Sequence, residues 1–278
     1  QNETARRCGP LRHAVLHLSC AGMARRPMPA CFGAIRRTAA ALADFDAACE
    51  VLKRVAFGLM RPKGFPMSKK IAVLAVQGAF VEHERALAKL GCECVELRQG
   101  SDVEQPYDAL VLPGGESTAQ AKMLRELGML DTLKSRVAAG MPVLGTCAGL
   151  ILLAQNVEEG VPAAGDPNGP VAAGATAAGA IGTLPVTVRR NAYGRQLGSF
   201  RTVAPCAGLP GVPDGETADI PMTFIRAPFI KAVSDDVKVL ATVDDRIVAV
   251  RYENQLGVSF HPELDDDLRI HELLVSLI

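Results

Sequence analysis

The chain is organised around the stretch Pro142-Val143-Leu144-Gly145-Thr146-Cys147-Ala148-Gly149-Leu150-Ile151-Leu152-Leu153-Ala154. An apolar run typical of a strand passes through Gly-x-Cys-x-Gly into an Ala/Leu-rich run typical of a helix. This pattern predicts a nucleophile elbow with cysteine in the serine position, where a helix N-terminus favours the thiolate. The two glycines let neighbouring backbone approach the turn without a Cβ clash. Taken alone, the pattern fits a small buried structural cysteine equally well.

Strands and helices alternate ahead of this turn. Apolar runs at 71–76, 92–97 and 109–112 predict strands, whereas 80–90 and 118–139 have helical spacing, with a break expected near Gly128. The first run is apolar throughout, as in a strand buried on both faces of a parallel sheet. The alternation predicts an α/β fold in three layers. We expect a doubly wound, mostly parallel sheet with helices on both faces and function at the carboxyl ends of its strands.

The second half of the chain continues the pattern with shorter elements. Gly- and Ala-rich residues 156–182 are expected to form a flexible surface insertion, and Asp244-Asp245 a hairpin turn. The expected strands are 184–190, 196–204, 237–243, 246–251 and 255–260, followed by a closing helix at 266–277.

Residues 1–66 differ from the rest of the chain. They hold 11 basic and 4 acidic residues, an excess of 7, whereas residues 67–278 hold 19 basic and 26 acidic ones. An Arg-rich transit peptide, a basic arm for nucleic acid, and translation from a start codon placed too early would each produce this composition. We favour the third explanation, with Met67 as the working start. The domains are therefore expected to be a basic, disordered or mis-called extension at 1–66 and a catalytic domain at 67–278.

Composition excludes several classes of protein. The 278 residues, 49% of them hydrophobic, suffice for one large domain with or without an appendage. No apolar run approaches the ~20 uncharged residues of a membrane span. No Cys/His spacing resembles a zinc site. We therefore expect no membrane or metal partner and, because the early start codon is the favoured explanation of residues 1–66, no nucleic acid partner.

A cysteine nucleophile needs a base, and three histidines lie outside the basic extension. His83 has glutamates on both sides and is expected on a solvated helix face, and His271 is expected to be a surface or half-buried residue of the closing helix. His261 ends an apolar strand and is followed by Pro262-Glu263. Glu263 would orient one ring nitrogen while the other takes the thiol proton. A turn histidine without a catalytic role is the alternative.

Six ordered stretches then establish a family resemblance. Three of them resemble the Cys-His-Glu class I glutamine amidotransferases: Pro113-Gly114-Gly115-Glu116-Ser117-Thr118, Gly145-Thr146-Cys147-Ala148-Gly149-Leu150 and Phe260-His261-Pro262-Glu263-Leu264. Three more resemble the glutaminase subunits of pyridoxal 5′-phosphate synthases: Leu74-Ala75-Val76-Gln77-Gly78, Arg190-Asn191-Ala192-Tyr193-Gly194-Arg195-Gln196 and Phe224-Ile225-Arg226-Ala227-Pro228. The resemblance spans 67–278 and implies a flavodoxin-like sheet.

The resemblance implies roles for particular residues. Cys147 would attack the side-chain amide carbon of L-glutamine, His261 would protonate the departing ammonia, and Glu263 would orient His261. The oxyanion would be held by the N–H groups of Gly115 and Ala148. The implied L-glutamine-binding residues are Gly115, Glu116, Ser117, Arg190, Ile225 and Arg226. Glu116 could hold either the substrate ammonium or its own loop, and Arg195 could exchange roles with Arg190.

The resemblance also implies a partner. Ammonia would pass to a (β/α)8-barrel synthase subunit that makes pyridoxal 5′-phosphate, a product of the assembly rather than a cofactor of this chain. The chain itself would need neither cofactor nor metal and would act in the cytoplasm. Weak activity is expected until the partner orders the oxyanion loop, and Gln77-Gly78 is a candidate contact.

Three alternatives remain open at this point. A glutaminase for another biosynthetic pathway would share the triad. A γ-glutamyl peptidase would use the same nucleophile but release amino acids or peptides. An inactive binding subunit would retain only the fold.

The expected start at Met67 can be tested directly. Intact mass spectrometry of the protein purified from its native source should give a chain that begins near Met67. Recovery of the full Arg-rich segment in that material would contradict the expectation.

Overall fold

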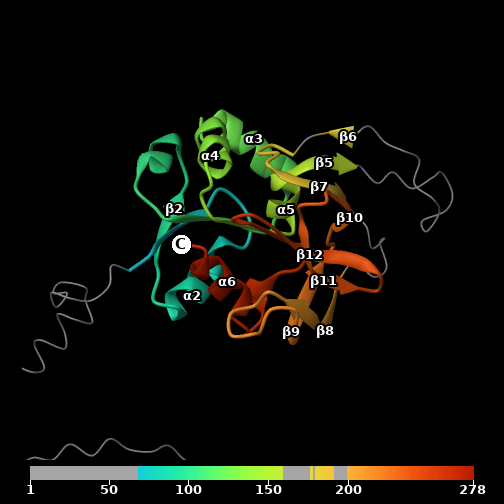
Figure 1. Cartoon of the computed structure of the whole chain (residues 1–278). Helices are drawn as coiled ribbons and strands as arrows, with labels where there is room; N and C mark the ends of the chain where they lie inside the picture. Colours follow the sequence, from blue (N-terminus) through green and yellow to red (C-terminus); the bar gives the residue numbers. More distant parts are fainter. Residues whose placement is uncertain (1–67, 159–175, 178, 191–198) are drawn as a thin grey trace, which may run out of the picture. The chain divides into compact units, whose positions relative to one another are not determined.

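The computed structural model describes residues 68–158, 176–177, 179–190 and 199–278 (Figure 1). Within these residues the main sheet runs in the order β2-β1-β3-β4-β13-β12-β10-β7-β5-β6, with β11 paired to β12. Its strands are β1 (Lys70–Leu74), β2 (Glu93–Leu97), β3 (Ala109–Leu112), β4 (Val143–Thr146), β5 (Ala154–Glu158), β6 (Thr176–Ala177), β7 (Leu184–Arg189), β10 (Phe229–Val233), β11 (Lys238–Val243), β12 (Arg246–Tyr252) and β13 (Gln255–Val258).

The strands β2, β1, β3, β4 and β13 are parallel neighbours and form the half of the sheet that carries the elbow. Successive side chains of a strand point to opposite faces. In β1, Ile71 and Val73 join the apolar core on one face, whereas Ala72 and Leu74 join the core on the other. All four are fully buried, which explains why this stretch is apolar without alternation.

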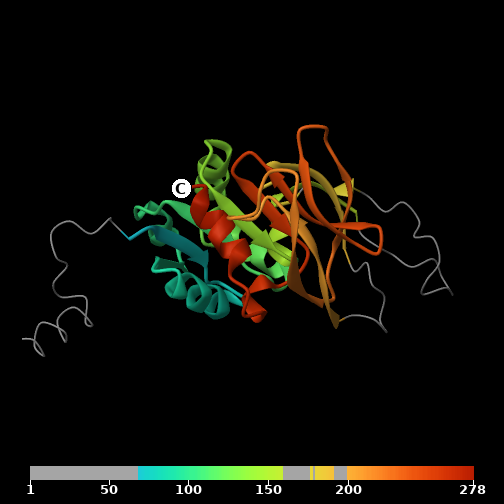
Figure 2. The same cartoon turned by 60° about the horizontal axis from the view of Figure 1, so that its bottom comes forward.

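Helices cover both faces of this half (Figure 1). One core takes side chains from α3 (Ser117–Glu126), α4 (Leu130–Ala138), α5 (Ala148–Leu153) and the 3-10 turn η1 (Gly100–Glu104). The other takes them from α2 (Phe80–Lys89) and α6 (Arg269–Ser276), and Figure 2 shows α6 lying along the sheet. The predicted α/β fold, with helices on both faces of a parallel sheet, is confirmed.

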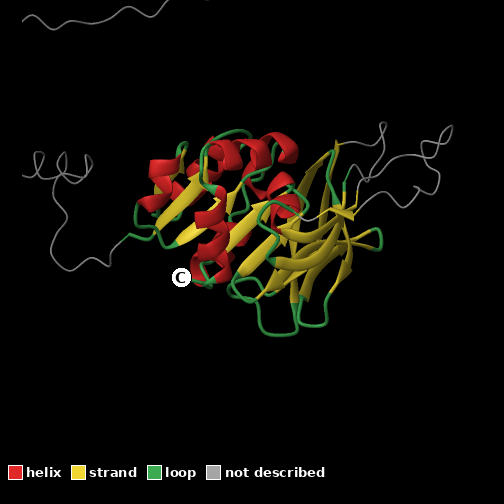
Figure 3. Cartoon of the chain, turned by 90° about the horizontal axis from the view of Figure 1, so that it is seen from above, coloured by secondary structure: helices red, strands yellow, loops and turns green. Residues whose placement is uncertain are grey.

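Beyond β13 the sheet continues through β12, β10 and β7 in antiparallel pairs. A separate two-stranded sheet, β8 (Ser199–Ala207) with β9 (Thr217–Ile225), packs its apolar side into the same core as α2 and α6. Figure 3 shows this part of the molecule as strands, with the helices gathered around the parallel strands.

Two local expectations are confirmed. The helical stretch 118–139 is divided into α3 and α4 at Gly128, whose φ of +70° is in the left-handed region that glycine tolerates. Asp244 and Asp245 connect β11 to β12 with φ values of 48° and 59°. Positive φ at both central residues is the geometry of a two-residue hairpin turn.

Other expectations need correction. The sequence reasoning assigned no strand to β9 or β10, although these two strands bring Ile225 and its neighbours to the elbow. It also missed β5, which runs into the expected insertion at 156–182, and β6 within it; most of the insertion lies outside the described residues, as do 196–198. β5 is partly exposed and β9 is interrupted by Pro221, so their apolar patterns are weak.

The elbow depends on a close approach between α5 and β3. A Cβ on Gly149 would lie 1.9 Å from the carbonyl oxygen of Leu112, which is backbone and fixed in the sheet. By contrast, a Cβ on Gly257 would meet the methyl ends of Leu150 and Leu184, at 2.7 and 2.9 Å. Side-chain ends can move aside at low cost, but a central strand cannot.

We therefore expect Gly149→Ala to lower the free energy of unfolding by about 3 kcal/mol, the upper end for overpacked sites. Gly257→Ala is the matched control and should cost about 1 kcal/mol. Urea denaturation of the two variants measures the difference. Equal losses would contradict a backbone clash at Gly149.

Candidate active site

Cys147 occupies the turn between β4 and α5, with φ 48° and ψ −97°. This positive φ is rare outside glycine and is a strained conformation typical of functional turns. The Cys147 N–H donates to Val258 O of the neighbouring parallel strand at 2.8 Å, which ties the turn to β13. The thiol is 7% exposed and lies 4.0 Å from Ile225 O, at the limit of a hydrogen bond to sulfur. The predicted elbow geometry is therefore present.

His261 follows β13 and precedes the 3-10 turn η2 (Pro262–Leu264). Its backbone N–H donates to Thr223 O of β9 at 2.8 Å, so the unpredicted strand holds the histidine in place. Its Nδ1 lies 2.7 Å from Glu263 Oε1. Because an ionised carboxylate only accepts, Nδ1 carries the proton and Nε2 is the atom left for the thiol.

The electrostatics favour the protonated form of His261. Burial by itself lowers the pKa of His261, but the hydrogen bonds with Cys147 and Glu263 and the negative charges of both groups raise it to about 10. Burial would raise the pKa of Glu263, yet its interactions with His83 and His261 hold it below the usual value. His261 is therefore protonated at neutral pH when the thiolate is present, as a cysteine nucleophile requires.

The expectation of a solvated His83 is wrong, and so is that of a surface or half-buried His271. Both residues are fully buried, and His83 Nδ1 lies 2.9 Å from His271 Nε2. On the other side, His83 Nε2 lies 3.3 Å from Glu263 Oε2. His83 lies on the same helix face as the buried Leu87, four residues later, and this spacing indicates burial. The two flanking glutamates led instead to the expectation of a solvated ring.

The loop after β3 lies against the ring of His261. A Cβ on Gly114 would lie 2.3 Å from His261 Cε1, so only glycine leaves room for the ring. Gly114 O accepts from Ala79 N at 3.1 Å. Since the N–H and C=O of a trans peptide point in opposite directions, the Gly115 N–H points away from Ala79.

Glu116 holds this loop. Its carboxylate accepts from the backbone N–H groups of Thr118 and Ala119 at 3.1 and 2.6 Å and so caps α3. The Thr118 hydroxyl, with these N–H groups and Arg190, keeps the pKa of Glu116 below its usual value despite partial burial. Of the two roles left open for Glu116, the geometry matches holding the loop. Gln77 supports the same loop, because its Oε1 accepts from Glu116 N at 2.8 Å.

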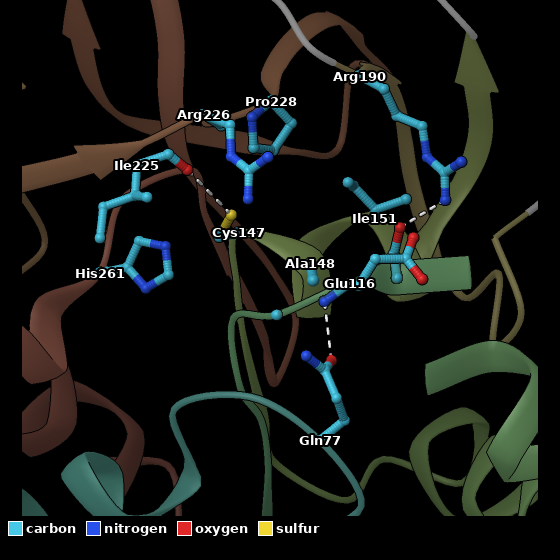
Figure 4. Close-up of a pocket in the computed structure, with 12 residues that line it drawn as sticks. Gln77, Glu116, Cys147, Ala148, Ile151, Arg190, Ile225, Arg226, Pro228 and His261 are labelled. Atoms are coloured by element: carbon cyan, nitrogen blue, oxygen red, sulfur yellow. Dashed lines mark hydrogen bonds between the residues drawn. The ribbon is translucent and has the colours of Figure 1, made fainter. Parts of the chain in front are cut away.

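These parts enclose a cavity of about 360 Å³ beside the thiol (Figure 4). Every residue expected to bind L-glutamine contributes to its wall, together with three that the sequence reasoning did not place there, Gln77, Ile151 and Pro228. The wall consists of Gln77, Gly115, Glu116, Ser117, Cys147, Ala148, Ile151, Arg190, Ile225, Arg226, Pro228 and His261. Glu263 lies behind His261, and Arg195 lies outside the described residues.

The two arginines lie at different places on the wall. Arg190 donates to the Ser117 hydroxyl, and Arg226 has a positive φ of 44° at the corner between β9 and β10. Figure 4 shows Arg226 beside Cys147 and Arg190 above Ile151. Two cations, backbone N–H groups and a thiol in one small cavity suit a ligand with a carboxylate and a reactive carbonyl.

Other kinds of site were sought in the same residues. No group of three or more His, Cys, Asp or Glu in the described part of the chain is placed to hold a metal ion. The described helices are all too short or too polar to cross a bilayer.

A nucleophilic cysteine on a strand-turn-helix elbow, paired with a histidine and a glutamate at the edge of a parallel sheet, defines the class of triad glutamine amidotransferases. The family model of the SNO glutamine amidotransferase family matches residues 73–278, and the chain belongs to this family.

Individual relatives agree with this assignment. The chain is 51% identical over 209 residues to the pyridoxal 5′-phosphate synthase subunit PdxT of Desulfitobacterium hafniense, covering 75% of this chain and 93% of that protein. It is 48% identical to the PdxT of Methanocorpusculum labreanum, covering 75% and 97%. A crystal structure described as a glutamine amidotransferase superposes with a TM-score of 0.61 at 38% identity, covering 74% and 97%.

The contact between Gly114 and His261 yields a test. Gly114→Ala should reduce glutaminase activity at least about a hundredfold, because the added methyl displaces the ring from the thiol, and misplacement by about 1 Å has effects of this size. Circular dichroism should be unchanged. Gly128→Asn is the control, since asparagine tolerates a positive φ and nothing lies within 4 Å. Full activity of Gly114→Ala would show that the ring does not depend on this glycine.

Proposed function

We propose that this chain is the glutaminase subunit of a pyridoxal 5′-phosphate synthase and hydrolyses L-glutamine to L-glutamate and ammonia. The observation that carries the proposal is the arrangement of Cys147, His261 and Glu263 beside a cavity with two arginines in its wall. The printed name of the relatives, a pyridoxal 5′-phosphate synthase subunit, supports the pathway. None of the alternatives considered from the sequence is favoured by these similarities.

In the proposed reaction the Cys147 thiolate attacks the side-chain amide carbon of glutamine, and a tetrahedral intermediate forms. His261, which is protonated, donates its Nε2 proton to the amide nitrogen, so the C–N bond breaks and ammonia leaves. Water, deprotonated by His261, then attacks the γ-glutamyl thioester. The C–S bond then breaks and glutamate leaves, so that Cys147 is again a thiolate and His261, which holds the proton taken from water, is again an imidazolium. Glu263 holds the imidazole in the tautomer that each step needs.

The oxyanion is proposed to lie between two backbone N–H groups. Ala148 is the first residue of α5, where an N–H has no partner within the helix. Gly115 supplies the second, on the side of its peptide that points away from Ala79. Removal of one such donor typically costs 10² to 10³ in rate, on the order of 3 kcal/mol.

The cavity is proposed to bind the amino-acid end of glutamine through Arg190 and Arg226. Either guanidinium can form the paired hydrogen bonds that a carboxylate favours. Ser117 holds Arg190, and Ile225 contributes an apolar side chain beside the aliphatic part of the substrate. A volume of about 360 Å³ lies at the small end of ligand sites, which suits a single amino acid.

Ammonia is proposed to pass to a separate synthase subunit, a (β/α)8 barrel, rather than to solvent. Gln77 is a candidate for communication with that partner, since it follows β1 in the chain and contacts both the loop that carries Gly115 and Gln120 of α3. The partner would then raise the activity by acting on this loop.

We also propose the cytoplasm as the location. The cysteines within the described residues, Cys92, Cys94, Cys147 and Cys206, are all free thiols, which supports a reducing compartment.

Replacement of the nucleophile tests the proposal. Cys147→Ser should lower glutamine-dependent ammonia release at least about a thousandfold, measured on the chain with a (β/α)8 synthase subunit present. Cys94→Ser, a partly buried cysteine on β2, is the matched control and should retain activity. Unchanged activity in Cys147→Ser would exclude this nucleophile. Stimulation by a barrel from another pathway, and not by a pyridoxal phosphate synthase barrel, would reassign the pathway.

A further inference from the structure

A second row of buried polar side chains lies behind the triad. Glu263 uses Oε1 for His261, and its other oxygen, Oε2, lies 3.3 Å from His83 Nε2. His83 Nε2 also lies 3.2 Å from the hydroxyl of Thr146, the residue before the nucleophile. His83 Nδ1 lies 2.9 Å from His271 Nε2. The side chains of His83 and Glu263 are completely buried.

The positions of the protons in this row follow from the carboxylate. If His83 Nε2 were unprotonated, its lone pair would face a negatively charged oxygen, so Nε2 must carry the hydrogen. Nδ1 is then an acceptor, and the hydrogen between the two rings belongs to His271 Nε2. The hydrogen bonds therefore run in one direction, from His271 through His83 to Thr146, and Glu263 Oε2 lies 3.3 Å from the same His83 nitrogen.

Both outer histidines remain uncharged in this arrangement. Burial lowers the pKa of His83, with His261 acting in the same direction, and this outweighs the carboxylates of Glu263 and Glu82. Burial and the neighbouring His83 lower the pKa of His271 to about 3, against the effect of Glu263. Of the two rings that contact the Glu263 carboxylate, His261 is thus the one expected to be cationic at neutral pH.

We propose that His83 is a positioning residue for the triad, with His271 fixing its tautomer, so that the Nε2–H of His83 holds the Glu263 carboxylate toward His261. A buried carboxylate oxygen that accepts no hydrogen bond is costly. Glu263 Oε2 is such an atom among the described residues, and His83 Nε2, 3.3 Å away, contacts it as an ion-pair partner. His83 and His271 come from α2 and α6, whereas Glu263 belongs to η2. The contact therefore makes the orientation of the catalytic base depend on two helices outside the cavity.

A purely structural role is the alternative. In that case His83 and His271 fill space between α2, α6 and the sheet, and any loss of function would follow loss of stability. The two roles differ in the pH at which Cys147 becomes reactive. If His83 holds the Glu263 carboxylate toward His261, replacing His83 makes the protonated form of His261 less stable. The thiolate of Cys147 beside it is then also less stable and forms at a higher pH.

The test compares His83→Leu with Leu87→Ala, a variant of a fully buried residue on the same helix whose apolar side chain cannot donate a hydrogen bond to Glu263. The rate of Cys147 alkylation by iodoacetamide is measured against pH on the full chain, and kcat and KM for glutamine are measured with the synthase subunit present. His83→Leu should raise the pH midpoint of alkylation by about one unit and lower kcat about tenfold, with KM within about twofold. Leu87→Ala should change neither the midpoint nor kcat.

Rescue provides the second comparison. His83→Gln retains an N–H that can face Glu263 and should restore most of the lost kcat and the original pH midpoint. If His83→Leu behaves like Leu87→Ala, or if His83→Gln is as impaired as His83→Leu, the positioning role is wrong. Because alkylation needs no substrate, this result is independent of whether the chain hydrolyses glutamine.

A measurement on the unsubstituted protein covers the case in which His83→Leu does not fold. Nitrogen-15 NMR of the histidine side chains at pH 7 should show both His83 and His271 as neutral rings with the proton on Nε2. A protonated His83, or a proton on its Nδ1, would overturn the proposed direction of hydrogen bonds.

Discussion

The rest of the site depends on the interactions of the buried Glu263 carboxylate with the two histidines beside it. A charge removed from water is stable only when polar partners surround it, and here the partners come from different parts of the chain. His261 Nδ1 is 2.7 Å from one oxygen, and His83 Nε2 is 3.3 Å from the other. The carboxylate thereby joins η2 to α2 and sets the protonation of the residue that faces Cys147. This carboxylate therefore matters both for the packing of η2 against α2 and for the protonation of His261.

Close approaches that only glycine permits shape both the elbow and the loop after β3. Gly149 brings α5 against Leu112, and Gly114 brings the loop after β3 against the His261 ring. A methyl group at either position would overlap atoms that cannot move without opening the cavity or displacing the base. Glu116, bonded to the start of α3, keeps the second of these approaches in place. At both positions glycine permits an approach that a larger residue would prevent, and the cavity beside the thiol depends on these approaches.

Much of the fold was predictable because its signals are local. Uninterrupted apolar runs at β1 and β3 indicated strands buried on both faces, and Gly-x-Cys-x-Gly indicated the strand-turn-helix. The strands β9 and β10 were missed because β9 alternates between buried and half-exposed residues and contains Pro221, and β10 is short. Yet Thr223 of β9 holds the backbone of His261 and Ile225 lies beside the thiol. The site therefore rests partly on strands whose sequence signal is weak.

The amino-acid sequence alone determined the fold class and indicated the candidate nucleophile, base and carboxylate, since each lies in a short ordered motif at the end of a strand. Tertiary structure decided the rest. It assigned Glu116 to its own loop, placed Gln77 beside Gly115, and buried His83 and His271 behind Glu263. The physical reason is that burial and hydrogen bonding are properties of neighbours far apart in the chain. His83 and Glu263 are 180 positions apart, so two flanking glutamates dominated the local pattern while a distant carboxylate determined the environment of the ring.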